Sequence, residues 1–334
     1  MKKKIYALIF VMFLSIFTGC SNNTENSITE QQIIRVAFNQ NTEHPQYKAM
    51  KKLGDDFEKA TGGKFKMKIY PNGVLGSQTE ALEFIRTGAL QLAIVPTSAP
   101  EGYDSNYAIV GAPYLYQDID HMSRAVQAGV YDKLFKSSDK YGFETMTVYT
   151  AGERNVYSKK PIKNVEDLAG QIIRVNDSPT YIEMTKLMGG SGAVMAQSEV
   201  YTALQQGVID AAENSELVFR DFKHYEVTPY YAYTKHIVHP DVVVASTEFL
   251  STLTKEEREI LDNLVKESSQ YEFDTFKEEI KKAKIEIEEK GTKFNYPDVE
   301  KLREMVSPLT ERIANQSEIT KDIYDNINNL REEN

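Results

Sequence analysis

Cysteine occurs once in the 334 residues, as Cys20. A single cysteine excludes an intrachain disulfide, and its place near the N-terminus leaves no thiol elsewhere for covalent catalysis. The sequence also lacks a GxSxG nucleophile elbow, an HExxH metal motif and a phosphate loop that ends in Gly-Lys-Ser/Thr. These absences count against the common hydrolase, metalloprotease and nucleotide-binding classes, and we predict a protein without catalytic activity.

Histidine is also scarce, with five residues. His236 and His239 have a spacing that could in principle serve zinc, but the TKHIVHP run around them resembles a strand. Side chains three apart in a strand point to opposite faces, which does not suit a shared metal. The glycine-rich segment 189–192 precedes a strand, the wrong side for a phosphate cradle, and a turn is the simpler interpretation. We predict neither a metal nor a cofactor.

Positive charge is in short supply. Lysine and arginine number 39 against 49 aspartate and glutamate residues, which gives a formal net charge of −10. An acidic surface disfavours nucleic acid and anionic lipid as partners, so an anionic ligand would need a local arginine site that acts against the overall field. The length suffices for one large or two medium domains, and we predict a monomer.

The N-terminal apolar run, residues 5–19, is shorter than the ~20 residues that a membrane span needs. It follows three lysines and leads into Phe17-Thr18-Gly19-Cys20, which resembles a bacterial lipobox with Phe in place of the usual Leu. We predict a signal peptide at 1–19, with a lipid on Cys20 after cleavage; the alternative is an uncleaved anchor helix. Residues 20–32 are polar and form a predicted flexible tether, which places the protein outside the cytoplasm at the membrane surface.

The stretch 167–215 predicts a β-α-β-α-β unit. Its expected elements are strands at 171–176, 193–196 and 208–212, with helices at 179–187 and 198–206. Alternation along the first strand places Arg174 and Asn176 on one face. Ligands bind beyond the carboxyl ends of the strands in such units, and Arg174, Asn176 and Asn214 lie near such ends. The unit therefore indicates a binding crevice.

Arg174 lies between Ile173 and Val175 in a strand that is expected to be buried. A buried guanidinium is costly unless an anion meets it, and a ligand carboxylate would do so with two parallel hydrogen bonds. The alternatives are a structural Asp or Glu partner, or exposure to water.

The N-terminal half repeats this pattern and brings Asn39 and Thr97 or Ser98 to crevice positions. Its expected elements are strands at 33–39, 65–70 and 90–95, with helices at 45–60 and 77–86. A helix at 121–135 and a strand at 143–150 follow. We predict a hinge at 149–154 and a return crossing near His239-Pro240, which leads into a strand at 241–246.

One long helix is predicted over 255–291. It carries an apolar stripe at Leu261, Leu264, Tyr271, Phe273 and Phe276.

Four runs resemble the solute-binding receptors of tripartite ATP-independent periplasmic (TRAP) transporters, the DctP-type family. They are EHPQYKA (43–49), YPNGVLGSQTEAL (70–82), DLAGQIIRV (167–175) and SEVYTALQQGVIDAAEN (198–214). The resemblance covers the chain from about residue 33 to the end. It implies an α/β fold of two lobes that close on a ligand at a hinge, braced by the long helix. The lobes expected are 33–151 with 240–279, and 152–239 with 280–334.

By this resemblance, Arg174 clamps the substrate carboxylate, and Arg154, Asn214 and Asn39 are further ligand contacts. The chain departs from the family pattern at Ala211, usually Gly, and at Ser215, often Pro. The polar residues expected in the crevice suit an acid with several hydroxyl groups, and we predict a hexuronate such as glucuronate or galacturonate, with sialate or a C4-dicarboxylate as alternatives. These residues are Asn39, Glu43, His44, Gln78, Thr97, Ser98, Asn176 and Gln197.

The function that follows is a membrane-tethered extracytoplasmic receptor that captures an organic acid and delivers it to the TRAP permease subunits. Two rivals remain. An enzyme acting on acidic sugars would need a base near Arg174, for which Glu213 is the candidate. A sensory module would bind the same acid and signal to a membrane partner.

Overall fold

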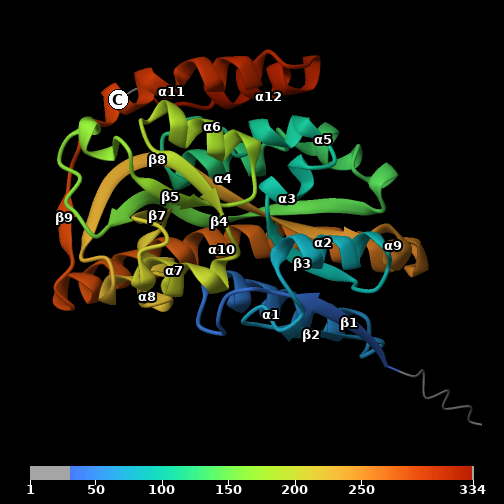
Figure 1. The fold of residues 1–334 in the computed structure, drawn as a ribbon. Coiled ribbons are helices and arrows are strands. Elements are labelled where there is room, and N and C mark those ends of the chain that lie inside the picture. Colours follow the sequence, from blue (N-terminus) through green and yellow to red (C-terminus); the bar gives the residue numbers. More distant parts are fainter. Residues whose placement is uncertain (1–30, 333–334) are drawn as a thin grey trace, which may run out of the picture. The chain divides into compact units, whose positions relative to one another are not determined.

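Residues 31–332, which the computed structural model describes, contain one mixed sheet of nine strands (Figure 1). The strand order is β2-β1-β3-β8-β4-β7-β5-β6, and β9 pairs with β8. The strands are β1 (Gln32–Ala37), β2 (Phe65–Tyr70), β3 (Leu92–Pro96), β4 (Phe143–Ser158), β5 (Ile172–Val175), β6 (Ser191–Val194), β7 (Ala211–Asn214), β8 (Tyr230–Ser246) and β9 (Lys293–Asn295). The predicted tether, residues 20–32, therefore extends one residue too far, since Gln32 already belongs to β1.

Helices connect and cover these strands. They are α1 (Pro45–Ala60), α2 (Gln78–Arg86), α3 (Ser98–Glu101), α4 (Ile119–Gln127), α5 (Asp132–Lys136), α6 (Pro179–Leu187), α7 (Val200–Gln206), α8 (Glu216–Asp221), α9 (Thr247–Thr252), α10 (Lys255–Glu289), α11 (Val299–Ala314) and α12 (Glu318–Asn329). Within this part of the chain, no helix combines the length and the apolar character that crossing a membrane requires.

Two long antiparallel strands, β4 and β8, join two parallel halves of the sheet. On one side β1 pairs in parallel with β2 and β3, and β3 lies against the C-terminal part of β8. On the other side β5 pairs in parallel with β6 and β7, and β7 lies against the C-terminal part of β4. Each half is a β-α-β-α-β arrangement, as the sequence predicts.

The crossing between the halves runs through continuous strands. The sequence pattern ends the strand near residue 150 and begins a new one at 241, but β4 extends to Ser158 and β8 covers Tyr230–Ser246. The pairing of β4 with β8 shifts register between Thr150 and Glu153, where Gly152 has a φ of +86°. A Cβ on Gly152 would lie 2.8 Å from the Phe276 ring, so this bulge requires glycine.

Several local boundaries differ from the sequence expectation by a few residues, and three of these differences have a visible cause or consequence. The predicted helix 121–135 is two helices, α4 and α5, because Gly129 turns the chain at a φ of +69°. The second strand of the 167–215 unit begins at Ser191, two residues before the predicted 193. The third strand is Ala211–Asn214, whereas 208–212 is predicted; Val208 is 59% exposed and precedes the pairing with β4. Asn214 therefore lies inside β7 and does not follow it.

The long helix is α10, Lys255–Glu289, which begins at a capping box between Thr254 and Glu257. It packs against α1, α8 and α4 and against β4, and so contacts elements attached to both halves of the sheet (Figure 1). Its buried apolar residues include Leu261, Phe273 and Phe276, as predicted. Tyr271, which the predicted stripe also contained, is 40% exposed. The predicted brace is present.

Candidate functional site

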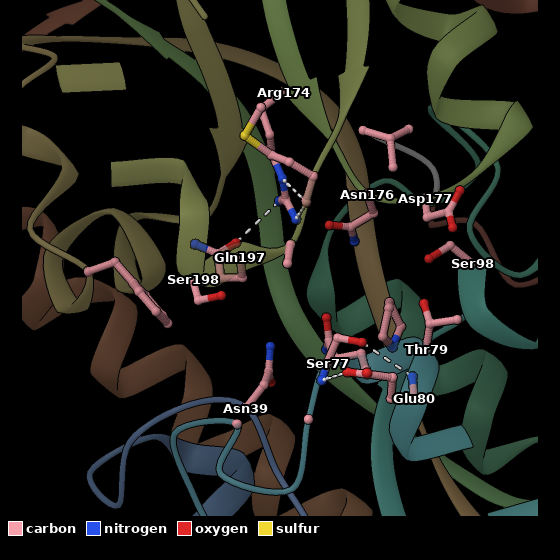
Figure 2. Close-up of a pocket in the computed structure, with 18 of the residues that line it drawn as sticks. Asn39, Ser77, Thr79, Glu80, Ser98, Arg174, Asn176, Asp177, Gln197 and Ser198 are labelled. Atoms are coloured by element: carbon pink, nitrogen blue, oxygen red, sulfur yellow. Dashed lines mark hydrogen bonds between the residues drawn. The ribbon is translucent and has the colours of Figure 1, made fainter. Parts of the chain in front are cut away.

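A cleft of about 530 Å³ lies where the carboxyl ends of parallel strands from both halves of the sheet converge (Figure 2). It is lined by Asn39, Asn72, Gly73, Gly76, Ser77, Gln78, Thr79, Glu80, Pro96, Ser98, Arg174, Asn176, Asp177, Val194, Met195, Ala196, Gln197, Ser198 and Phe222. This is the place that the strand topology predicts for a ligand. Six of the predicted ligand-binding residues line it, namely Asn39, Gln78, Ser98, Arg174, Asn176 and Gln197.

One wall comes from the N-terminal half. Asn39 follows β1, and the loop after β2 leads through Gly76 to Ser77, which caps α2. Ser77 accepts a hydrogen bond from the backbone N–H of Glu80, whose side chain accepts one from the backbone N–H of Ser77 in return. The capping box fixes the first turn of α2, with Gln78 and Thr79, against the cleft.

Arg174 forms the opposite wall, on β5. Its Nε and Nη2 donate to the backbone oxygen of Met195 at 3.0 and 2.8 Å, and its Nη1 donates to Oε1 of Gln197 at 3.2 Å. The side chain is buried, and it forms no ion pair with any residue in 31–332. Burial and the nearby charge of Arg154 lower the pKa of Arg174 to about 10, so it remains a cation at neutral pH.

Gln197 complements this arginine. Its Oε1 accepts from Arg174, whereas its Nε2 is buried and has no hydrogen-bond partner among the described residues. A buried amide N–H without a partner costs free energy, and a ligand oxygen would remove that cost. Gln197 thus orients the guanidinium and offers a second donor beside it (Figure 2).

Arg154 does not line the cleft. It is buried and bonded to Glu213: Nη2 donates to Oε1 at 2.6 Å and to the backbone oxygen at 2.8 Å, and Nε donates to Oε2. His236 Nε2 lies 3.2 Å from the same Oε2. Burial acts to raise the pKa of Glu213, but Arg154 and His236 outweigh it and hold that pKa well below its usual range. A carboxylate held in this way is a poor general base, which counts against the enzyme hypothesis.

Four other predicted residues also lie outside the cleft lining, and one of them, Thr97, is buried directly after β3. Asn214 is buried in β7, and its Oδ1 accepts from the backbone N–H of Ser215 at 3.0 Å. Glu43 is exposed, and its Oε2 lies 3.7 Å from Nζ of Lys48. His44 caps α1 and is buried, and burial lowers its pKa to about 4, so it is neutral at physiological pH. The ligand contacts predicted for these residues stay predictions.

The paired histidines of β8 have separate partners. His236 contacts Thr234 and Glu213, whereas His239 contacts Tyr181 at 3.1 Å and Asp241 at 3.4 Å. No cluster of three or more His, Cys, Asp or Glu side chains suited to a metal ion occurs in residues 31–332.

Several lining residues were not identified from the sequence, namely Asn72, Ser77, Thr79, Glu80, Asp177, Ser198 and Phe222. For some of these residues, a sequence pattern could have predicted their place at the crevice. Ser77 and Glu80 form a recognisable capping box, and the N-terminus of a helix that follows a parallel strand faces the crevice. Asp177 directly follows Asn176 beyond the same strand end. Phe222, at the end of α8, had no such signal.

The family model described as bacterial extracellular solute-binding protein, family 7 (DctP), matches residues 36–317. The chain belongs to this family. Among relatives, it is 34% identical to the uncharacterized protein YiiZ of Salmonella typhimurium, over 86% of this chain and 88% of the other. The predicted receptor family is thereby confirmed, and it places the protein among extracytoplasmic binding proteins that serve transport.

Solved structures of TRAP periplasmic solute-binding proteins share the fold. One from Anaerococcus prevotii, with bound d-glucuronate, has a TM-score of 0.86 and 34% identity, and the match covers 90% of this chain and 98% of the other. One from Xanthobacter autotrophicus, with bound β-d-galacturonate, has a TM-score of 0.86 and 27% identity, covering 89% and 100%. The predicted two-lobed α/β fold is confirmed, while the assigned lobe boundaries stay a prediction.

Proposed function

We propose that this family 7 receptor captures a hexuronate, d-glucuronate or d-galacturonate, in the cleft and delivers it to the membrane subunits of a TRAP transporter. The observation that carries the proposal is Arg174, a buried cation in the cleft wall without a carboxylate partner among the described residues. Three of its five N–H groups are occupied, by two neutral oxygens, which leaves donors for an incoming anion.

A carboxylate is the group that best matches this wall. The guanidinium offers planar paired donors, and the free Nε2 of Gln197 adds a third donor beside them. A ligand carboxylate would also supply the negative charge that burial of Arg174 otherwise leaves uncompensated.

The remainder of the cleft suits hydroxyl groups. Amide and hydroxyl side chains line it from both halves, among them Asn39, Ser98, Asn176 and Ser198, and each can both donate and accept hydrogen bonds. Phe222 adds an apolar surface. The volume is in the range of ordinary small-molecule sites, and the structural relatives described above hold hexuronates in the same fold.

The tether and the partner also belong to the proposal. Cys20 and the preceding signal-like segment lie outside the described residues, so their support is the lipobox-like sequence alone. A lipid on Cys20 would hold the receptor at the membrane surface, close to the permease. Capture and delivery require no bond making or breaking, so we propose no catalytic step.

The test is calorimetric titration of the ligand-free protein with d-glucuronate and d-galacturonate. Arg174→Lys should weaken binding roughly 10- to 100-fold, because lysine keeps the charge but loses the fork, and a charge-assisted hydrogen bond contributes about 1.5–3 kcal/mol.

The matched control is Arg35→Lys, a strand arginine whose Nη2 also donates to a backbone oxygen, that of Ala89, but which lies outside the cleft lining. It should bind as wild type does. Equal hexuronate affinity of Arg174→Lys and wild type would exclude Arg174 as the carboxylate clamp. Failure of the wild-type protein to bind any hexuronate would exclude hexuronates as the ligand.

A further inference from the structure

The charges that line the cleft are unevenly distributed. Among its lining residues in the described chain there is one cation, Arg174, and there are two anions, Glu80 and Asp177. The anions come from different halves of the sheet, Glu80 from α2 and Asp177 from the segment after β5, and both are exposed. Figure 2 shows both acids and Arg174 around the same open space.

Asp177 has no structural role that would account for its charge. In residues 31–332, its carboxylate takes part in no hydrogen bond and no ion pair, whereas its neighbour Ser178 caps α6 by accepting from the backbone N–H of Tyr181. The preceding residue, Asn176, also lines the cleft. The carboxylate of Asp177 is therefore available to a ligand.

Glu80 is held in place but is not neutralised. Its Oε2 accepts from the backbone N–H of Ser77 at 2.7 Å, and it forms no ion pair within the described chain. This hydrogen bond holds the pKa of Glu80 below its usual value, so the group is charged at neutral pH. Because the capping box fixes its position, Glu80 is not free to swing away from a ligand.

We infer that Asp177 and Glu80 are specificity-determining residues that make the cleft accept a single carboxylate, at Arg174, and reject ligands with a second one. The inference rests on the proposed function. A hydroxyl group can donate to either acid, whereas a second carboxylate has no proton to donate and is repelled by both. The ligand class selected is monocarboxylic polyhydroxy acids, with aldaric acids and C4-dicarboxylates excluded.

The test compares d-gluconate with d-glucarate, two open-chain acids that differ only by a terminal hydroxymethyl group against a carboxylate. Wild-type protein is titrated with both and with d-glucuronate, which reports separately on the proposed function. We expect d-glucarate to bind at least 30-fold more weakly than d-gluconate, or than d-glucuronate if d-gluconate is itself too weak to measure.

Asp177→Asn and Glu80→Gln keep the size of each side chain but remove its charge. Each variant should lower the ratio of d-gluconate affinity to d-glucarate affinity at least about fivefold. Glu304→Gln, which removes one exposed charge from α11 outside the cleft, should leave the ratio unchanged. If Asp177→Asn no longer binds either d-gluconate or d-glucarate, Glu80→Gln applies the same test from the opposite wall of the cleft.

Wild-type affinities for d-glucarate and d-gluconate within threefold of each other would overturn the inference. A ratio unchanged in both variants would also overturn it, provided that they bind d-glucuronate. A wild-type protein that binds d-glucarate but not d-glucuronate would overturn the inference and correct the substrate, whereas a protein that binds none of the three acids would overturn the proposed function and the inference together.

Discussion

Arg154 and Arg174 have the same side chain and nearly the same burial, but opposite surroundings. Arg154 is bonded to the carboxylate of Glu213, whereas Arg174 is held by a backbone oxygen and an amide oxygen. The charge of a guanidinium that already has its counter-ion is compensated, whereas one that lacks a counter-ion has a buried charge to satisfy. The comparison favours Arg174 over Arg154 as the carboxylate clamp, and a ligand contact by Arg154 stays a prediction.

Breaking the structural pair should be costly. Glu213→Gln leaves Arg154 buried without its counter-ion, and removal of one partner of a buried pair costs about 3–5 kcal/mol in the free energy of unfolding. Because the folded pKa of Glu213 lies below its unfolded value, the pair stabilises fully above pH ~4.3 and loses its contribution as the pH falls through the folded pKa.

Urea denaturation at pH 7 measures this cost. The control is Glu83→Gln, which removes a partly exposed pair with Arg86 and should cost less than about 1 kcal/mol. If Glu213→Gln lowered the free energy of unfolding as little as the control does, the stabilising role of the Arg154–Glu213 pair would be contradicted.

At the scale of elements, α10 places a buried carboxyl group against β4, next to the register shift between β4 and β8. Glu272 lies fully buried on this helix, and its Oε2 accepts from the backbone N–H of Thr150, directly before the register shift in β4. Burial and the nearby charge of Asp241 raise the pKa of Glu272 well above its usual value, against the opposing hydrogen bond from Thr150.

Glu272→Gln should therefore change the pH dependence of stability. The unfolded chain releases the proton of Glu272 near pH ~4.3, whereas the folded chain keeps it to higher pH, so this group destabilises progressively as the pH rises between the two values. The variant should match wild type near pH 4 and exceed its stability at pH 8.

Urea midpoints across this pH range measure the effect, with Glu267→Gln, an exposed position on the same helix, as the control. Parallel pH profiles for wild type and Glu272→Gln would show that the carboxyl group does not titrate in this way.

At the scale of the whole molecule, the proposed lipid on Cys20 would hold the receptor at the membrane surface. If Cys20 carries a lipid, wild-type protein should be found with the membrane fraction and should take up the lipid label. Cys20→Ser should lose the label, because the sequence has no second cysteine whose sulfur could carry the lipid. Fractionation with immunoblotting, together with labelling by a fatty-acid analogue, measures both outcomes. Membrane association without label would favour the uncleaved anchor helix.

The sequence alone determined the features that depend on local pattern. Helix caps, alternating apolar residues and glycine breaks predicted both β-α-β-α-β units and the extent of α10, and strand ends predicted Arg174 and Asn176 at the crevice. These succeed because hydrogen bonding and side-chain alternation over a few residues decide them.

Only the tertiary structure decided the rest. Val208 and Ile209 have strand character, but the neighbouring strand β4 pairs with Ala211–Asn214, so the pairing partner set the boundary of β7. The same register brings Glu213 to Arg154, and the converging halves place Glu80 opposite Asp177. Pairing partners and counter-ions come from segments distant in sequence, and their charges and hydrogen bonds act through space, so local pattern does not contain them.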